Sequence, residues 1–427
     1  MLLGAGIQSL KNYSKRCCVG FSYGVSFPLT LVILDYWLKD VGVPNHIIGL
    51  FTLLHWPFTL KFLWGIFVEH YDIPGLSKKV GRNRSWLLAS YLLLIVGVVG
   101  MAYSCPESNL LPIMIFASVV TIADGCKDVV IYPYQIGGAS PKKFGYVAGV
   151  VGFGYRIGFI VIKVTTLHLA HLFGWKVAYL TAAFLIFLSM IPIFFMKDPR
   201  AKQKRSKRKK NAPESLFRSL GESFSKSLVI PLKSLLSGDG GQKILAILML
   251  YKGADFMMQK MSRPFCLEVG FSKLEIANVV QLFGSVAVIV GGFLGGYLIK
   301  KMGVRRAMIA FGLAHGASFF SYLLLVAYER DTDVLCAVIF MEGVTGGSVT
   351  AAFLAFLYGL CKTGAQYALL WALHELGGML FMSISGFAAD YLGWIGYFSA
   401  VPFVFAPSLI LLKNSGNFRR TRLPKRR

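Results

Sequence analysis

Charged residues are scarce in this 427-residue chain and make up only 15% of it. Hydrophobic residues make up 55%, and the mean hydropathy is +0.60. A soluble globular domain carries roughly a quarter of its residues as Asp, Glu, Lys and Arg. The low charge therefore excludes an ordinary soluble domain and indicates a membrane protein with many spans.

Acidic residues are the scarcest charged type, with 20 Asp and Glu against 45 Lys and Arg, which gives a net charge of +25. In a soluble protein this excess would suggest a nucleic-acid partner. Here the basic residues gather in alternate loops, as expected for the cytoplasmic side of a membrane protein. We therefore expect both termini to be cytoplasmic, a lipid bilayer as the surroundings and no nucleic-acid partner. The basic cytoplasmic positions are Lys11, Lys15, Arg16, Lys78, Lys79, Arg82, Arg84, Lys142, Lys143, the run 202–210, Lys300, Lys301, Arg305, Arg306 and the tail 413–427; the opposite loops hold Lys39, Lys176, Lys273 and Arg330.

Several sequence motifs typical of enzymes and of metal or nucleotide sites are also missing. The sequence has no P-loop and no His-Glu-x-x-His motif, so we expect no ATP hydrolysis, metal site or cofactor. The acidic segment at 124–128 lacks the further clustered acids and adjacent Arg that lipid transferases use, which argues against a membrane enzyme. The seven cysteines are odd in number and predict no disulfide framework. No small-residue cleavage site follows the first apolar run, which is interpreted as an uncleaved span.

Long apolar segments are abundant instead, and a helical span needs about 20 such residues. Two sets of six can be placed, separated by a polar linker. We predict an N-terminal bundle at 1–196, a cytoplasmic linker at 197–242, a C-terminal bundle at 243–413 and a basic tail at 414–427. The twelve predicted spans are 18–38, 46–68, 86–104, 110–132, 145–169, 176–196, 243–265, 275–299, 306–327, 334–358, 365–387 and 394–412, of which 46–68 and 243–265 are the least cleanly apolar.

The linker has two parts of different character. Residues 199–212 form a block of like charge that cannot pack. Between 216 and 230, apolar residues recur at helical spacing among Arg, Lys and Ser. This pattern predicts an amphipathic helix, either lying on the inner membrane surface or packed beneath the bundle.

The two halves resemble one another in sequence. Gly-Trp pairs precede the last span of each half, and Trp175 and Trp394 are 219 positions apart (394 − 175). Basic turns begin at Gly81 and Gly303, which are 222 positions apart (303 − 81). Two landmarks with nearly the same offset indicate a duplicated six-span unit. Parallel repeats of this kind build transporters whose substrate site lies between the halves near the bilayer midplane.

Several motifs follow in the same order as in a known family and cover nearly the whole chain. They resemble AmpG-type muropeptide permeases, a branch of the major facilitator superfamily that is related to acetyl-CoA transporters. The sequence around Glu342 also resembles the tenth span of this family. The motifs are FTLKFLW at 58–64, GRNRSW at 81–86, KDVVIYPYQ at 127–135, GYRIG at 154–158, YKGAD at 251–255 and TGAQYALLWAL at 363–373.

The resemblance implies an all-α membrane protein with twelve transmembrane helices in two pseudo-symmetric halves. It further implies a monomeric secondary transporter of the bacterial inner membrane that imports anhydromuropeptides together with protons by alternating access. The alternative is a transporter of acetyl-CoA or another bulky organic anion. Three departures from the family pattern fall near the expected cavity: Tyr132 and Gln135 replace a second Asp and an Arg, and Lys163 stands in a glycine or serine region.

The fourth predicted span carries charges at the depth of the hydrocarbon, namely Asp124, Lys127 and Asp128. Successive helical residues turn by about 100°, so the two carboxylates share one face and Lys127 can pair with either. Charges in a span normally face the protein interior or a wet cavity. Asp128, the acid that aligns with the family, is our first proton-coupling candidate and Asp124 is a weaker one. The alternative is a structural pair between Lys127 and Asp128.

Further charged residues lie inside the predicted spans. Arg156 and Lys163 fall on one helical face and are candidates for binding substrate carboxylates, unless they neutralise the acids of the fourth span. Lys252 and Asp255 are three residues apart and can pair with each other or with a ligand. Lys61 is expected to extend toward the inner surface. The remaining candidates are Glu342 for proton coupling and Lys127, His374 and Glu375 for substrate binding.

Overall fold

The structure is a computed structural model, and the secondary structure of the described residues is entirely helical. This confirms the predicted all-α fold class. The residues described are 14–61, 64, 68, 71–136, 144–194, 241–328, 330–361 and 364–414. The charged block 199–212, the amphipathic segment at 216–230 and the tail from 415 onward lie outside them.

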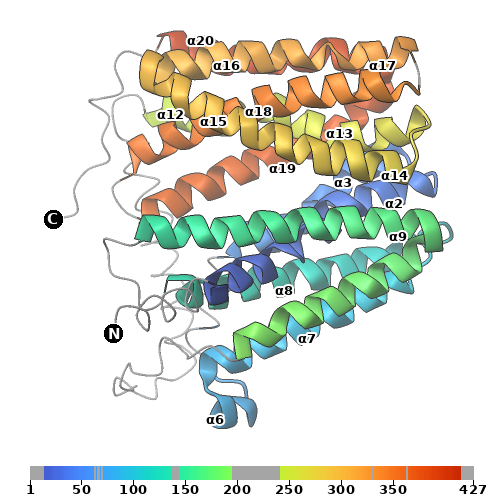
Figure 1. The fold of residues 1–427 in the computed structure, drawn as a ribbon, viewed down its shortest axis with the longest axis vertical. Coiled ribbons are helices and arrows are strands. Elements are labelled where there is room, and N and C mark those ends of the chain that lie inside the picture. The colour runs from blue at the N-terminus through green and yellow to red at the C-terminus, as the bar shows by residue number, and fades with distance from the viewer. Residues whose placement is uncertain are drawn as a thin grey trace, which may run out of the picture. The chain divides into compact units, whose positions relative to one another are not determined.

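Eight helices in the described part of the chain are long and apolar enough to cross a membrane. Two of these, at 150–192 and 369–414, are long enough for two crossings at about 1.5 Å per residue. Each contains a glycine with non-helical backbone, Gly174 or Gly393, at the junction between two predicted spans. Figure 1 shows α9 (Phe144–Phe194) as two arms that meet at a sharp bend.

The two predicted spans missing from these eight are the two that the sequence marked as least apolar. In the first of these, residues 45–59 form α3 (Asn45–Leu50), a 3₁₀ turn η2 (Phe51–His55) and α4 (Trp56–Thr59). The segment at 243–265 is divided into α12 (Gly241–Leu250) and α13 (Gly253–Glu268). Broken helices are tolerated at membrane depth where protein satisfies the freed backbone groups.

The described residues fall into two compact units, with the first formed by the described parts of 14–41 and 54–194 and the second by those of 42–53 and 241–414. The other elements of the first unit are η1 (Leu29–Ile33), α2 (Leu34–Asp40), α6 (Leu76–Val80), α7 (Arg82–Ala102) and α8 (Leu110–Ile136). Those of the second unit are α14 (Lys273–Glu275), η5 (Ile276–Phe283), α15 (Gly284–Met302), α16 (Val304–Phe319), α17 (Tyr322–Tyr328), α18 (Thr332–Leu360), α19 (Gly364–Ala400), η6 (Val401–Phe405) and α20 (Ala406–Asn414).

In the first unit, α7 packs on α8 and α9, and the helix at 14–40 meets α9 at very short range. A Cβ on Gly20 would overlap the carbonyl oxygen of Val151, and a Cβ on Gly154 would overlap that of Cys17. Gly24 and Gly158, each one turn further on, meet the opposite backbone in the same way. Small residues at this spacing let two membrane helices approach closely. This contact fixes the first helix beside the polar residues described below.

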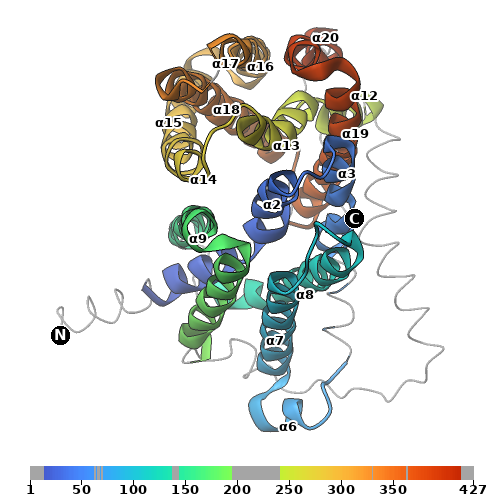
Figure 2. The ribbon, with the colours of Figure 1, turned by 90° about the vertical axis from the view of Figure 1, so that its right-hand side faces the viewer.

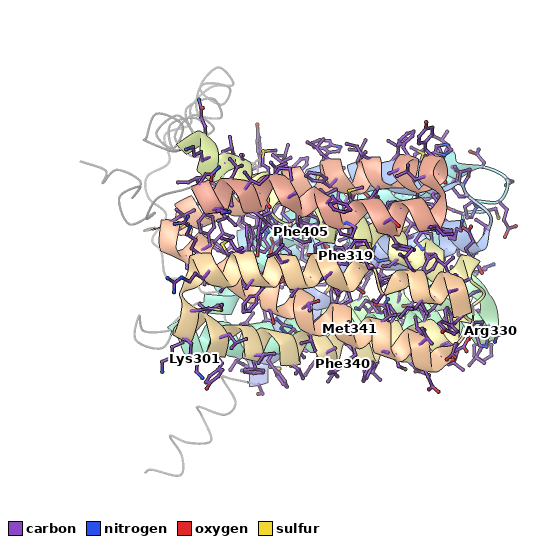
Figure 3. The ribbon with its side chains drawn as sticks, turned by 90° about the horizontal axis from the view of Figure 1, so that it is seen from above. Lys301, Phe319, Arg330, Phe340, Met341 and Phe405 are labelled. Carbon is purple, nitrogen blue, oxygen red and sulfur yellow. The ribbon has the colours of Figure 1, made fainter. Side chains whose placement is uncertain are left out.

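In the second unit, α18 packs on both α15 and α16, and the three helices lie side by side in Figure 2. Gly291 and Gly295 of α15 meet the backbone of Val344 and Ser348 of α18 so closely that a Cβ would overlap it. Lys301 and Arg330 lie at opposite ends of this unit in Figure 3. Depth within the unit is described below along the direction from one to the other.

The segment at 42–53 joins the second unit through α3, which packs on α19. A Cβ on Gly386 would overlap the carbonyl oxygen of Asn45, so the two backbones touch. His46 donates from its backbone nitrogen to Asp390 Oδ2 at 2.9 Å, and its Nδ1 lies 2.6 Å from the same oxygen. Close glycine packing and this polar contact together hold α3 in place.

The backbone repeats between the halves at the landmarks that the sequence identified. Gly81 has φ 87° and ψ 154°, and Gly303 has φ 80° and ψ 155°. Gly174 has φ 81° and ψ 169°, and Gly393 has φ 65° and ψ 173°. These positive φ angles favour glycine because it has no Cβ.

The tryptophans after two of these glycines repeat as well. Trp175 donates its indole hydrogen to Asp40 Oδ2 at 2.6 Å, and Trp394 donates to Glu268 Oε1 at 2.9 Å. The two acceptors correspond in position. Asp40 is the last residue of α2 and Glu268 is the last residue of α13, and each helix lies early in its half. The duplication therefore extends from sequence to backbone and to a side-chain hydrogen bond.

Candidate functional site

A buried ion pair lies inside the first unit. Lys127 Nζ is 2.6 Å from Asp124 Oδ1, and the two residues are 0% and 3% exposed. Both belong to α8 and are three residues apart, which places them on neighbouring positions of the helix surface. The acidic group therefore enters the apolar interior together with its own counter-charge.

Serines of the first helix complete this cluster. Ser26 Oγ donates to Asp124 Oδ1 at 2.6 Å and accepts from Lys127 Nζ. One turn earlier, Ser22 hydrogen-bonds the hydroxyl of Tyr91 and donates to Ser189 Oγ at 3.1 Å. Ser189 lies on α9, which the glycine contacts bring close to this helix. We call Ser22, Ser26, Tyr91, Asp124, Lys127 and Ser189 the first-unit polar cluster.

The other acid of α8, Asp128, pairs with Lys61. Of the two pairings that helical geometry allows, Lys127 therefore forms the one with Asp124, and the alternative pair with Asp128 is not formed. The Lys61 side chain is 36% exposed and that of Asp128 is 14% exposed. This second pair is therefore far more accessible than the first.

Arg156 and Lys163 of α9 lie in different environments. Lys163 is buried, and its Nζ lies 4.5 Å from the centre of the Phe159 ring. Arg156 is exposed. The two residues share a face, but seven helical residues span about 10 Å along the axis. This face of α9 is therefore exposed at Arg156 and buried by other segments at Lys163.

The second unit contains a polar cluster around Asp255 of α13. Lys252 Nζ lies 2.8 Å from Asp255 Oδ2 and 3.2 Å from Thr350 Oγ1. On the other side, His315 Nε2 of α16 lies 3.2 Å from Asp255 Oδ1. Asp255 therefore joins a lysine of its own segment to a histidine distant in sequence.

Glu342 of α18 accepts a hydrogen bond from the hydroxyl of Tyr322. Three residues further on, the Thr345 hydroxyl lies 3.1 Å from the Glu342 carbonyl oxygen and 2.8 Å from His315 Nδ1. Glu342 is thus one helical turn of α18 away from Thr345, the residue that contacts His315. Lys252, Asp255, His315, Tyr322, Glu342 and Thr345 are called the second-unit polar cluster.

His374 and Glu375 of α19 point in different directions. His374 is 2% exposed, and its Nδ1 lies 3.1 Å from the carbonyl oxygen of Leu248. Its ring centre is 4.3 Å from that of Phe353. Glu375 is half-buried. His374 contacts apolar rings and a backbone carbonyl, and these contacts are typical of a residue that packs in the core.

Sequence reasoning missed the most connected residue of this region, His315. The available signal was its place within the predicted span 306–327, because ionisable residues inside spans are uncommon. The side chains of Tyr132 and Gln135 lie outside the described residues. Within the described ranges, no group of three His, Cys, Asp or Glu side chains is placed to hold a metal ion.

A bundle of apolar helices with compensated charges inside it has the architecture of an integral membrane transporter. The chain matches the family model described as Major Facilitator Superfamily over residues 16–259, which is more than half of its length. It therefore belongs to the Major Facilitator Superfamily, and the fold class predicted from its motifs is confirmed.

Relatives across the whole chain have names that agree with the motif resemblance. The protein named AmpG 1 of Rickettsia bellii (strain RML369-C) is 26% identical over 92% of this chain and 95% of its own length. The anhydromuropeptide permease of Escherichia coli (strain K12) is 28% identical over 92% of this chain and 77% of its own length. The predicted resemblance to AmpG-type permeases is confirmed by these similarities.

Solved structures agree on the fold. A POT family transporter, crystallised with a thioalcohol-conjugated peptide, superposes with a TM-score of 0.68 at 12% identity and covers 94% of this chain and 95% of its own. The nucleoside transporter NupG superposes with a TM-score of 0.58, also at 12% identity, over 94% of this chain and 98% of its own.

Proposed function

We propose that this protein imports anhydromuropeptides, the sugar-peptides released in cell-wall recycling, as a proton-coupled secondary transporter. The observation that carries the proposal is the similarity along 92% of the chain to a relative named anhydromuropeptide permease. The curated relatives described above are named as transporters or permeases, which supports transport as the activity.

The charges inside the first unit support an anionic substrate. A substrate carboxylate that approaches Lys61 competes directly with Asp128 for the same ammonium group. Protonation of Asp128 removes that competition and leaves Lys61 available to the substrate. The partial exposure of this pair gives both the proton and the substrate access to it. Asp128 is therefore the proposed proton-coupling group of the first unit, and Lys61 is its proposed substrate partner.

The fully buried pair has a different proposed role. Asp124 and Lys127 already satisfy one another and Ser26, and they are almost completely covered. A buried pair of this kind is expensive to break. We assign it to holding the first helix on α8, with Asp128 as the proposed proton-coupling group.

The second half contributes its own cations and acids to the proposal. Lys252 is a candidate for a second substrate carboxylate, because Asp255 and Thr350 already orient its ammonium group. Glu342, with Tyr322 donating to it, is a second proton-coupling candidate. Lys163 and Arg156 remain candidates for the substrate's path.

Uptake into proteoliposomes tests the proposal. Purified full-length protein is reconstituted, and entry of labelled anhydromuropeptide is followed with and without an imposed pH gradient, with acetyl-CoA as competitor. We expect gradient-driven uptake that Asp128→Asn abolishes and acetyl-CoA leaves unchanged. Cys105→Ser serves as a control variant in an exposed loop. Absence of sugar-peptide uptake under every gradient would refute the substrate assignment, and inhibition by acetyl-CoA would favour the alternative bulky anion.

We place the protein in the bacterial inner membrane as part of this proposal, with both termini in the cytoplasm. We further propose that it is a monomer. The distribution of basic residues between loops supports this orientation. The second unit agrees with it, because Lys300 and Lys301 end α15 at the side opposite Arg330 (Figure 3).

A further inference from the structure

His315 lies in the middle of the second unit and is 1% exposed. Its ring centre is 4.5 Å from that of Phe319 and 6.0 Å from that of Phe405. Figure 3 shows these two phenylalanines between the ends marked by Lys301 and Arg330. The histidine is therefore at mid-depth, within an apolar setting, and each of its ring nitrogens has a polar partner.

The two partners differ in what they can donate. Nε2 faces Asp255 Oδ1 at 3.2 Å, and an ionised carboxylate can only accept. Nε2 therefore carries a hydrogen. Nδ1 faces the Thr345 hydroxyl at 2.8 Å, and a hydroxyl can either donate or accept. The hydrogen on Nδ1 is thus not fixed by its neighbour.

The Thr345 hydroxyl has a second use for its single hydrogen. Its oxygen lies 2.7 Å from the Met341 carbonyl oxygen and 3.1 Å from that of Glu342. When His315 is neutral, the hydroxyl can donate to Nδ1. When a proton occupies Nδ1, the hydroxyl can turn to a carbonyl and accept from the ring. In both protonation states each ring nitrogen and the hydroxyl hydrogen has a hydrogen-bond partner, so neither state leaves an orphan group in the apolar interior.

His374 shows why the hydroxyl matters. Its Nδ1 faces the carbonyl oxygen of Leu248, which can only accept, so the hydrogen on that nitrogen is fixed. His374 is buried in the same unit, as His315 is. His374 is thus held in one tautomer at this nitrogen, in contrast to Nδ1 of His315.

The charges around His315 come from several elements. Asp255 of α13 is paired with Lys252, and Glu342 of α18 receives the hydroxyl of Tyr322 and interacts electrostatically with Arg263. From η6 the ring meets Phe405, and on its own helix it meets Phe319 and Ser318. Charged residues of α15 and α20 stand in their last turns. Asp255 is already paired with Lys252, and a proton on His315 adds one positive charge beside Asp255.

We propose that Nδ1 of His315, together with the Thr345 hydroxyl, is a proton-binding site of the second half. The proton enters the Nδ1 lone pair as the hydroxyl hydrogen turns to the Met341 carbonyl, and it leaves by the reverse of these steps. Histidine is the side chain whose charge changes in the physiological pH range. The inference rests on the proposed proton-coupled transport and adds to it the residue that binds the proton in the second half.

Nitrogen NMR on the full-length protein tests the site without any substrate. The protein is labelled with ¹⁵N-histidine, reconstituted in liposomes and recorded by magic-angle spinning between pH 5 and pH 9. The resonances lost in His315→Gln belong to His315. We expect Nδ1 to gain a proton as the pH falls while Nε2 stays protonated throughout. A His315 ring that keeps one state over this range, or that titrates at Nε2, would overturn the proposal.

Variants of the hydroxyl distinguish a proton site from a packing contact. Thr345→Ser keeps the hydroxyl and should keep the titration. Thr345→Val removes the nearer acceptor of the charged state and leaves Ser318 Oγ, at 3.4 Å from Nδ1. The titration midpoint should therefore move down by up to about one pH unit, because hydrogen bonds to charged groups are the stronger ones. Thr166→Val is the matched control, since the buried Thr166 hydroxyl donates only to its own helix at Ile162. A midpoint equal in Thr345→Val and wild type would refute the role of the hydroxyl.

Transport measurements separate this inference from the proposed function. Exchange of labelled for unlabelled anhydromuropeptide across the liposome needs no net proton movement, whereas accumulation under a pH gradient does. We expect His315→Gln to retain exchange and to lose at least about tenfold in accumulation, a loss that corresponds to about 1.4 kcal/mol of coupling. Exchange that fails in the wild type contradicts the substrate assignment alone, because the NMR titration decides the proton site. Equal accumulation in His315→Gln and wild type contradicts the proton site.

Discussion

The buried pair of Asp124 and Lys127 gives a sharp prediction for stability. Lys127→Met removes the ammonium group and keeps an unbranched side chain in its place. Asp124, which is 3% exposed, then keeps only the hydrogen bond from Ser26 for its charge. Removing one partner of a buried ion pair costs about 3–5 kcal/mol, because the other charge remains uncompensated in a medium of low dielectric constant.

The more accessible pair of α8 is the matched comparison. Lys61→Met also removes an ammonium group from an aspartate, but the Lys61 side chain is 36% exposed. Exposed pairs contribute about 0–1 kcal/mol. The double variant Asp124→Asn with Lys127→Met should recover most of the loss seen in Lys127→Met, because replacing both members of a buried pair is often close to neutral.

Thermal unfolding of the purified full-length protein in detergent measures these differences. At roughly 2–4 °C per kcal/mol, Lys127→Met should lower the midpoint by about 10 °C and Lys61→Met by no more than about 4 °C. Equal midpoints for the two single variants would contradict the difference in burial. If the double variant is less stable than Lys127→Met, then the charge of Asp124 stabilises the folded protein even without Lys127, which would contradict this reasoning.

Three further predictions concern packing, the repeat and topology. Gly154→Ala should cost about 1–3 kcal/mol because its Cβ overlaps the Cys17 carbonyl oxygen, whereas Gly152→Ala, where nothing described lies within 4 Å, should not destabilise in the same unfolding measurement; equal effects would contradict the close helix contact. Trp394→Phe should cost about 0.5–1.5 kcal/mol through the lost hydrogen bond to the exposed Glu268 carboxylate, and an unchanged unfolding midpoint would show that this bond contributes nothing. Cys105 is exposed in the loop between α7 and α8, so a membrane-impermeant maleimide should label it in intact cells and not in Cys105→Ser; labelling only after lysis would reverse the proposed orientation.

The sequence predicted the parts of this molecule that depend on local patterns. Apolar runs located the spans, and glycines at matching offsets located the repeat, because positive φ angles leave few alternatives to glycine. The pairing of Lys252 with Asp255 was also predictable, since residues three apart on a helix are neighbours. The breaks at 46–68 and 243–265 left a trace in the sequence as weaker hydropathy.

Contacts between distant segments were not predictable in the same way. Helical geometry allowed Lys127 to pair with either Asp124 or Asp128, and the choice depends on Ser26 and Lys61, which come from other helices. His315 has a single charged neighbour within its hydrogen-bonding range, Asp255, which lies 60 positions away. The difference in exposure between Arg156 and Lys163 likewise depends on what covers α9, not on the face they share.

The pairing within α8 has a consequence for how the chain enters the bilayer during synthesis. Asp and Lys each cost about 2.5–3.5 kcal/mol at the centre of an inserting helix. Asp124 and Lys127 lie on the same helix, so α8 can cross as a locally neutral pair before any other segment arrives. Asp128 has its counter-charge on Lys61, which leaves the ribosome earlier. Asp128 therefore gains its counter-charge only when α8 packs against the segment that carries Lys61.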